Sequence, residues 1–302
     1  MVLGHINFAN APIKKWIYAF HMPLFFFASG LTLHEDNLRT FIIKKIKKIY
    51  LPYLFWGFIF SNFAIKSIPL LLYGSNYSIS QASSLSSLWF LPTLFIAEII
   101  VQVLFKITKN NKLLMLLAGL LLTISFILPE KVNGYYMNFD VSLIAVFFIV
   151  LGKVCHTYLD TIKNTKTMII TLIISFALSL LYLLNPINKD SYILLSVKQI
   201  GNPILFVMTA ICSIVFVCSL SILLDKYLIK NNYLMSLGQC TLPIFLFNKY
   251  VIKIFKYIFQ RIAFNLYIEL TITTIGTLII CFKFGKFIYK HFPILFGNYS
   301  NN

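Results

Sequence analysis

Two histidines near the start of the chain are the residues whose type and spacing best suit chemistry. His5 and His21 lie in apolar segments on either side of a connection centred near Pro12 and Ile13. Both are about equally far from that centre, so an antiparallel helical hairpin places the two imidazoles at about the same depth. An imidazole titrates near neutral pH and can take a proton from a hydroxyl. The alternative is that both are packing histidines, hydrogen-bonded between helices.

Three further polar side chains interrupt apolar segments, where each is costly and needs a reason. Glu98 lies about midway along its segment, Asp140 lies at the start of another, and Asn248 precedes Lys249. Glu98 and Asp140 could be counter-charges to a histidine or a lysine. Lys249 could extend toward the membrane surface or pair with a carboxylate. Taken singly, each of these residues also has a structural explanation.

The elements that must position these side chains are membrane-spanning helices. Of the 302 residues, 59% are apolar or aromatic and 12% are charged, whereas a soluble domain has about 45–50% and about 25%. We therefore expect an all-α polytopic transmembrane bundle that forms one domain, residues 1–302, with about nine complete spans. Met1–Asn10 is too short to cross a bilayer and is expected to be the remnant of a first helix. The expected spans are Trp16–Leu33, Leu51–Leu72, Leu88–Ile107, Leu113–Leu128, Phe139–Val154, Met168–Leu184, Pro203–Leu224, Leu242–Phe259 and Ile268–Ile288.

The basic residues recur at the ends of apolar runs, although the formal net charge is +17. That distribution favours membrane lipids as partners and argues against nucleic acid. Residues 34–50 read as an amphipathic helix at the membrane surface, and its basic side includes Lys44, Lys45, Lys47 and Lys48. No spacing of cysteines and histidines predicts a metal site.

Counting Lys and Arg divides the connections into two alternating sets. The richer set is 34–50, 106–112, 153–167, 225–240 and the end of the chain after residue 280, and it holds sixteen of the 26 basic residues. The positive-inside rule predicts that this set is cytoplasmic.

Several sequence blocks occur in the order and spacing of a known family. They are the run from His21 to Gly30 (HMPLFFFASG), Leu51-Pro52-Tyr53 after the basic segment, the run from Trp89 to Phe95 (WFLPTLF), Asn138-Phe139-Asp140 with Phe147-Phe148 and Gly152, and the run from Gly238 to Leu246 (GQCTLPIFL). Together they resemble the membrane-bound acyltransferase-3 family. More narrowly, they resemble its branch of fucose 4-O-acetylase-like sugar O-acetyltransferases.

The resemblance implies an O-acetyltransferase in the bacterial cytoplasmic membrane. Such an enzyme moves an acetyl group from acetyl-CoA, its donor rather than a permanently bound cofactor, to a hydroxyl of a cell-surface polysaccharide or lipid-linked sugar. The family motif is a basic residue, ten intervening residues and a histidine, and Gly4-His5 matches its end. The basic position would precede Met1, so we expect this start to be internal to a longer reading frame. Asn248 departs from the histidine that many relatives carry in the late helix.

On this resemblance, His5 is the expected general base and His21 the second catalytic residue. Ser29, His21 or Asn248 could donate a hydrogen bond to the developing oxyanion. The expected substrate-binding residues are Ser29, Trp89, Glu98, Asp140 and Asn248, and the donor phosphates are expected at Lys44, Lys45, Lys47 and Lys48. Two alternatives stay open. One is a transporter or flippase of lipid-linked glycans, and the other is a catalytically inactive family member that acts as a scaffold.

Overall fold

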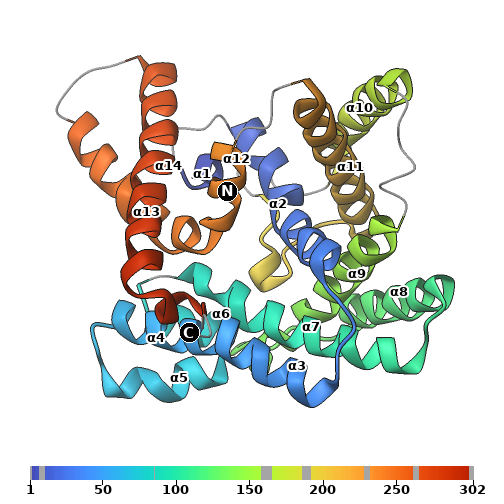
Figure 1. Cartoon of the computed structure of the whole chain (residues 1–302), viewed down its shortest axis with the longest axis horizontal. Helices are drawn as coiled ribbons and strands as arrows, with labels where there is room; N and C mark the ends of the chain where they lie inside the picture. Colours follow the sequence, from blue (N-terminus) through green and yellow to red (C-terminus); the bar gives the residue numbers. More distant parts are fainter. Residues whose placement is uncertain are drawn as a thin grey trace.

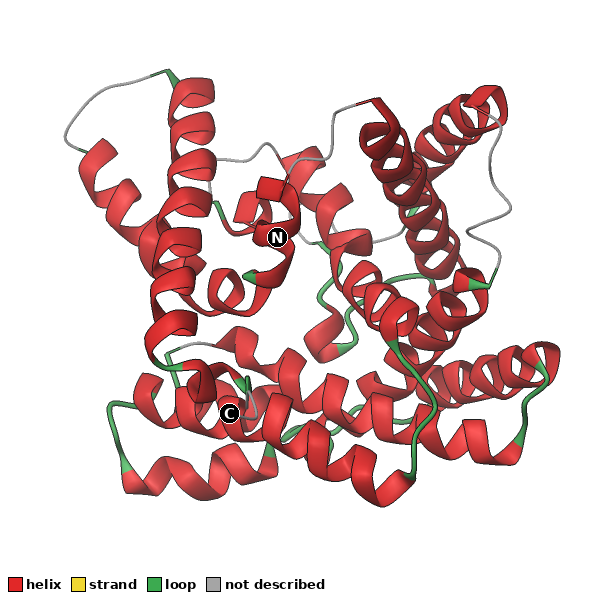
Figure 2. Cartoon of the chain, in the orientation of Figure 1, coloured by secondary structure: helices red, strands yellow, loops and turns green. Residues whose placement is uncertain are grey.

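The structure, a computed structural model, describes residues 2–6, 11–84, 86–157, 165–185, 192–227, 232–260 and 265–298. Within these ranges the chain is helical, and its one β-bridge, between Leu194 and Gln199, belongs to no strand. Figures 1 and 2 show helices throughout the described part of the chain. The expected all-α class is confirmed.

Fourteen α-helices are described in these ranges, along with short 3-10 and π-helical turns. The α-helices are α1 (Val2–His5), α2 (Ala11–Thr32), α3 (Leu38–Lys45), α4 (Leu51–Phe60), α5 (Ile68–Tyr73), α6 (Asn76–Ala82), α7 (Phe90–Ile107), α8 (Asn111–Ile127), α9 (Phe139–His156), α10 (Thr165–Ser179), α11 (Pro203–Tyr227), α12 (Asn232–Gln239), α13 (Thr241–Phe259) and α14 (Leu266–His291). The turns used below are η1 (Ile46–Tyr50), η2 (Ile65–Ser67), η3 (Ser86–Trp89), η7 (Leu195–Val197) and η8 (Pro293–Phe296).

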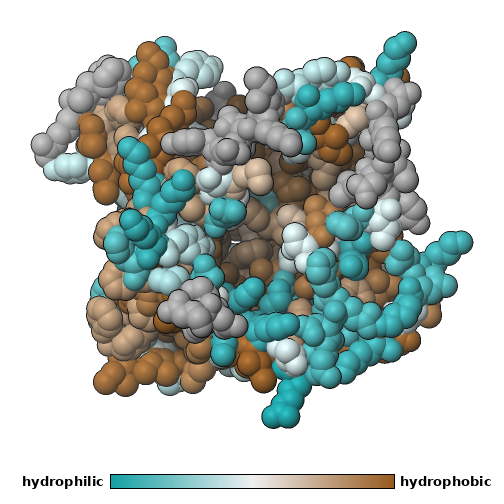
Figure 3. All heavy atoms as spheres, in the orientation of Figure 1, coloured by the Kyte–Doolittle hydropathy of each residue, from teal (hydrophilic) through white to brown (hydrophobic). Residues whose placement is uncertain are grey.

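Among the described residues, five helical segments are long and apolar enough to cross a membrane. They are Ser86–Ile107, Tyr136–His156, Thr165–Leu184, Pro203–Tyr227 and Leu266–His291. Apolar side chains also cover large parts of the face shown in Figure 3. The chain is therefore a multi-pass membrane protein, but the expected count of nine complete spans is not confirmed. One reason is that α8 has only 17 residues, while about 20 are needed to cross the hydrocarbon core.

The expectation of a single span over Leu51–Leu72 is wrong. Helix α4 ends at Phe60, Asn62 and Phe63 adopt left-handed backbone angles (φ 55° and 59°), and α5 begins at Ile68. Left-handed residues end a helix because they cannot continue its hydrogen bonds. The amphipathic segment before this region is helical, as expected, from Leu38 through η1. Pro52 has no N–H for the carbonyl four residues earlier, and the helix widens into the π-helical turn η1 just before it.

The connections gather at two ends of the bundle. At one end, Lys109 forms an ion pair with Glu35, which joins the connection before α3 to the one after α7. At the other end, the Asn76 backbone N–H donates to Asn138 Oδ1 at 2.7 Å. Helices α7, α8 and α9 each run from one of these ends to the other. These two contacts agree with the predicted division for the connections that they join. Residues 158–164 and 228–231 lie outside the described ranges.

Helices α2 and α9 are packed backbone against backbone. A Cβ added to Gly30 would lie 1.9 Å from the Ile149 carbonyl oxygen, and one added to Gly152 would lie 2.1 Å from the Phe27 oxygen. Small residues allow this close approach of membrane helices. The contact holds α2, which carries His21, against α9, which is buried on most of its surface.

Candidate active site

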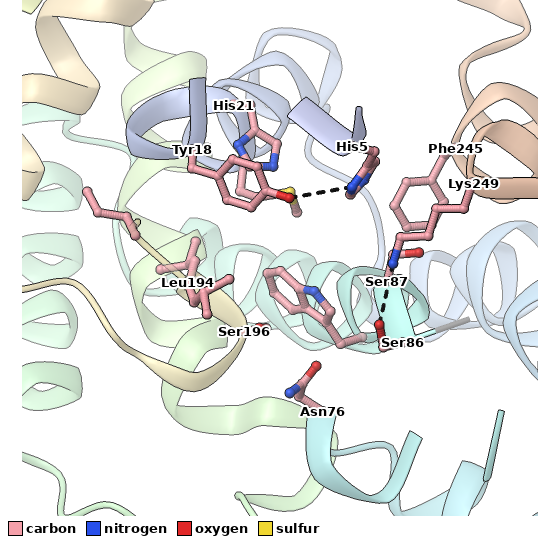
Figure 4. A pocket seen from close by; sticks show the side chains of 14 residues that line it. His5, Tyr18, His21, Asn76, Ser86, Ser87, Leu194, Ser196, Phe245 and Lys249 are labelled. Carbon is pink, nitrogen blue, oxygen red and sulfur yellow. Dashed lines mark hydrogen bonds between the residues drawn. The ribbon is translucent and has the colours of Figure 1, made fainter. Parts of the chain in front are cut away.

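His5 and His21 line the same cavity, which we call the histidine cavity. It has a volume of about 130 Å³ and lies among α1, α2, α6, η3, η7 and α13. Tyr18, one turn before His21 on α2, lies between the two imidazoles. Its hydroxyl is 3.4 Å from His5 Nδ1, and its ring centroid is 4.8 Å from that of His21. Figure 4 shows the three side chains together. Tertiary packing thus brings the two predicted catalytic residues to one site.

The hydrogen bonds of His21 determine which of its nitrogens can act as a base. Its Nδ1 lies 3.0 Å from the Ile17 carbonyl oxygen, one turn earlier on α2. Because a carbonyl only accepts hydrogen bonds, Nδ1 must carry a proton. In a neutral imidazole Nε2 then keeps its lone pair. A general base needs such a nitrogen, held in place by a hydrogen bond at the other one.

Lys249 and Ser86 complete the polar lining on the side of α13 and η3. Lys249 Nζ lies 3.4 Å from Ser86 Oγ, so its described partner is a hydroxyl rather than a carboxylate. Trp89 also lines the cavity, as expected for a substrate-binding residue. Tyr18 was not among the site residues expected from the sequence. The signal was present, since residues three apart on a helix share a face and Tyr18 precedes His21 by three.

Glu98 and Ser29 lie away from the histidine cavity, in a buried polar cluster that joins three helices. Ser29 Oγ of α2 donates to Glu98 Oε1 of α7 at 2.6 Å, and Lys45 Nζ of α3 lies 2.7 Å from Glu98 Oε2. Glu98 is 2% exposed. A carboxylate buried this deeply needs a charged partner. In this structure the hydrogen bond from Ser29 and the ion pair with Lys45 join α2, α3 and α7 at Glu98.

Removing Lys45 should therefore destabilise the fold far more than removing its neighbour Lys44. A Lys45→Met variant leaves Glu98 buried without its counter-charge, which costs about 3–5 kcal/mol for such pairs. Lys44 pairs with the exposed Asp36 at 2.6 Å, so Lys44→Met is the matched control and should change stability little. Thermal unfolding of the purified full chain measures both. Equal melting temperatures for the two variants would contradict a stabilising role for the Glu98 cluster.

Asp140 and Asn248 have partners of their own. Asp140 Oδ2 lies 3.6 Å from Lys198 Nζ, beside a second cavity described below. Asn248 is fully buried, and its amide donates to the Ile244 and Phe245 carbonyls of its own helix at 2.8 and 2.9 Å. Neither side chain lines the histidine cavity. Of the three expected oxyanion donors, the structure places only His21 there.

The four predicted phosphate-binding lysines have different surroundings. Lys45 is engaged by Glu98, and the ammonium of Lys44 lowers the pKa of the Asp36 carboxyl through its hydrogen bond. Lys47 and Lys48 lie on the exposed part of η1. Lys48 also lines an apolar cavity of about 200 Å³, which shares two of its lining residues, Met22 and Phe245, with the histidine cavity.

The described ranges contain no group of side chains that could form a metal site. No group of three or more histidine, cysteine, aspartate or glutamate side chains is placed there to hold a metal ion. Such sites need several of these side chains directed at one point.

The site lies within the part of the chain that matches a protein-family model. A family model described as an acyltransferase domain matches residues 1–285. No curated protein and no solved structure matches the chain. The matched region includes every residue that lines the histidine cavity.

Proposed function

Because the chain belongs to the acyltransferase-3 family, we propose that this membrane acyltransferase moves an acetyl group from acetyl-CoA to a hydroxyl of a cell-surface polysaccharide or lipid-linked sugar. Its place in the fucose 4-O-acetylase-like branch and in a bacterial cytoplasmic membrane belongs to the same proposal. One observation carries it. Two imidazoles on different helices contact Tyr18 in one cavity, and one of them has its tautomer set by a backbone carbonyl.

In the proposed reaction, His21 Nε2 takes the proton of the acceptor hydroxyl as its oxygen attacks the thioester carbonyl. The carbon–sulfur bond then breaks, and the imidazolium returns the proton to the leaving sulfur, which gives the ester and free CoA. A positioned base of this kind contributes typically about 10²–10⁴-fold. The sequence pointed to His5 as the base. We assign this role to His21 because its hydrogen bond with the Ile17 carbonyl sets its tautomer.

The oxyanion of the tetrahedral intermediate needs hydrogen-bond donors in the same cavity. Lys249 supplies an ammonium, and Tyr18 supplies a hydroxyl that is already close to His5. Tyr18 lies on the same helix as Ser29, and Lys249 follows Asn248 on α13, so the expected helices supply these donors from other positions. His5, in this scheme, orients Tyr18 and does not take the acceptor proton.

The apolar cavity at Lys48 offers a route for the donor. Its lining is mainly apolar from α2, η1, α7 and α13, and it adjoins the histidine cavity at Met22 and Phe245. We place the acyl-carrying arm of acetyl-CoA in this cavity, with Lys48 beside the donor's phosphates. A lysine ammonium is a common phosphate ligand.

A Lys48→Glu variant should raise the KM for acetyl-CoA, because it replaces a phosphate-binding cation with a repelling charge. The KM for S-acetyl-N-acetylcysteamine, a donor without phosphates, should stay the same. Lys66→Glu on η2 is the control, since Lys66 is exposed and lines none of these cavities. Steady-state kinetics with both donors decide the matter. A parallel rise in both KM values would remove Lys48 from phosphate binding.

The proposed function is tested with the purified full chain, radiolabelled acetyl-CoA and envelope glycan of the source cells. We expect label in the glycan, alkali-labile as an ester, and an equal amount of released CoA thiol. A transporter would move glycan across a vesicle membrane without releasing CoA. Neither label nor thiol above the heat-denatured control would refute the acetyltransferase proposal.

A further inference from the structure

A second, larger cavity lies next to the histidine cavity. This polar cavity, of about 540 Å³, lies between α6, the connection from α8 to α9, and η7. Asn76 of α6 and Ser196 of η7 line both cavities. In Figure 4, Asn76 lies across the histidine cavity from His5 and His21. A molecule in the polar cavity therefore contacts two side chains that also line the histidine cavity.

Hydrogen bonds hold the segments that line the polar cavity. Asn138 accepts from the Asn76 backbone and donates to the Gly74 carbonyl at 3.2 Å. Lys198 Nζ donates to the Ser125 and Leu128 carbonyls at 3.1 and 3.0 Å. Asn138 and Lys198 both have left-handed backbone angles, φ 50° and 54°. Strained backbone of this kind persists where the surroundings hold it and is common at binding sites.

Two polar groups at the junction of the cavities remain available to a ligand. Between described residues, no hydrogen bond involves the Asn76 carboxamide or the Ser196 hydroxyl. Asn76 can both donate and accept, and so can Ser196. Tyr77, next along α6, is 45% exposed and also lines the polar cavity. Hydroxyl groups and a flat C–H face are the features that such a lining can bind.

The charges of the polar cavity balance one another. Asp140 is paired with Lys198 at 3.6 Å, and the Lys131 ammonium lies over the Tyr135 ring, 4.3 Å from its centroid. Glu130 and Lys131 carry opposite formal charges, so the four charged residues of the lining sum to zero. A lining without net charge gives an anionic ligand little net attraction to offset the cost of desolvating its charge. The lining suits an uncharged ligand with many hydroxyl groups.

We propose that the polar cavity binds an uncharged sugar unit of the acceptor, and that Asn76 and Ser196 guide its reacting hydroxyl to His21. This inference rests on the proposed function for the reaction, but the binding site itself does not. Neither residue stood out in the sequence, because Asn76 begins α6 and Ser196 lies in η7. These segments are far apart in the sequence from each other and from the histidines.

Binding is tested without any acyl donor, by following alkylation of an introduced thiol. A Ser196→Cys variant of the full chain is treated with N-ethylmaleimide, and modification at position 196 is quantified by mass spectrometry. We expect the neutral fraction of the host's envelope glycan to slow this alkylation severalfold and the acidic fraction to leave it unchanged. Ser80→Cys, also in the polar cavity, is a second reporter should the first variant fold poorly. Ser221→Cys on α11 is the control that the glycan should not protect.

Kinetics then connect the polar cavity to catalysis. Asn76→Ala and Ser196→Ala should each raise the KM for the glycan roughly two- to tenfold, the effect of losing one neutral hydrogen bond, with the KM for acetyl-CoA unchanged. Ser221→Ala should change neither. Unprotected alkylation in both reporters, or an unchanged glycan KM in both alanine variants, would overturn the inference. Protection without any acyl transfer by the wild type would instead refute the proposed function and leave the sugar site standing.

Discussion

A His21→Ala variant is expected to lose roughly 10²- to 10⁴-fold of kcat for acyl transfer, the usual contribution of a positioned general base. The reason is the Nε2 lone pair, which the hydrogen bond from Nδ1 to the Ile17 carbonyl keeps free for the acceptor proton. Without it, the hydroxyl attacks the thioester as a weak nucleophile. The measurement is the rate of CoA thiol release by the purified full chain with glycan in excess.

Two further variants separate catalysis by His21 from packing. In His21→Asn the side-chain amide can still donate to the Ile17 carbonyl, but it cannot take a proton. We expect this variant to unfold at the wild-type temperature and to be as inactive as the alanine variant. His34→Ala, in the exposed connection before α3, is the control and should keep full activity. An active His21→Asn enzyme would mean that His21 only packs α2.

His5 and Tyr18 should show smaller and coupled losses. Tyr18→Phe removes the hydroxyl that lies 3.4 Å from His5 Nδ1 and leaves the ring in place. If His5 acts by orienting that hydroxyl, His5→Ala and Tyr18→Phe should lower kcat by similar factors, and the double variant should be little worse than either one. If the two factors in kcat multiply in the double variant, His5 has a role that does not depend on Tyr18, such as that of the general base expected from the sequence.

A Gly152→Ala variant is the second change for which we expect a large effect, this time on folding. Its Cβ would lie 2.1 Å from the Phe27 carbonyl oxygen and 3.2 Å from Gly30 Cα. Both neighbours are backbone, so no side chain can move aside and the two helices must separate. Overpacking typically costs about 1–3 kcal/mol, and more where it cannot be relieved. Because α2 carries His21, activity should fall together with stability.

Thermal unfolding of the purified chain checks the Gly152 prediction, and the chain offers a matched control. Gly119 lies in α8, and a Cβ added there meets nothing within 4 Å. Gly119→Ala should therefore leave the melting temperature unchanged or raise it slightly, since alanine favours helices. Equal melting temperatures for Gly119→Ala and Gly152→Ala would show that α2 and α9 are not in close backbone contact.

Much of the architecture was predictable from composition and periodicity. Long apolar runs must satisfy their backbone groups within one segment, and only helices do so in a chain of this kind. The same reasoning failed for Leu51–Leu72, where hydropathy is high but Asn62 and Phe63 end the helix. Hydropathy measures which side chains tolerate lipid, and it is insensitive to the backbone angles of two residues.

Although Pro12 and Ile13, the expected centre of the connection, lie inside α2, which begins at Ala11, the sharing of one site by His5 and His21 was predicted. The direction in which each helix turns its polar residues was not. Glu98 had been expected near the substrate, yet α7 turns it toward Ser29 and Lys45, on the other side from Trp89. Periodicity says which residues share a face of one helix, while contacts with several neighbours decide where that face points.

By itself, then, the sequence determined a helical membrane protein of the acyltransferase-3 family with a histidine pair near its start. Only the tertiary structure decided which groups join that pair. Apart from Tyr18, which shares a helix face with His21, these groups are Lys249, Asn76 and Ser196, and they come from three other segments. No local pattern links segments so far apart. Their meeting depends on how the helices rotate and pack, which is a property of all their contacts together.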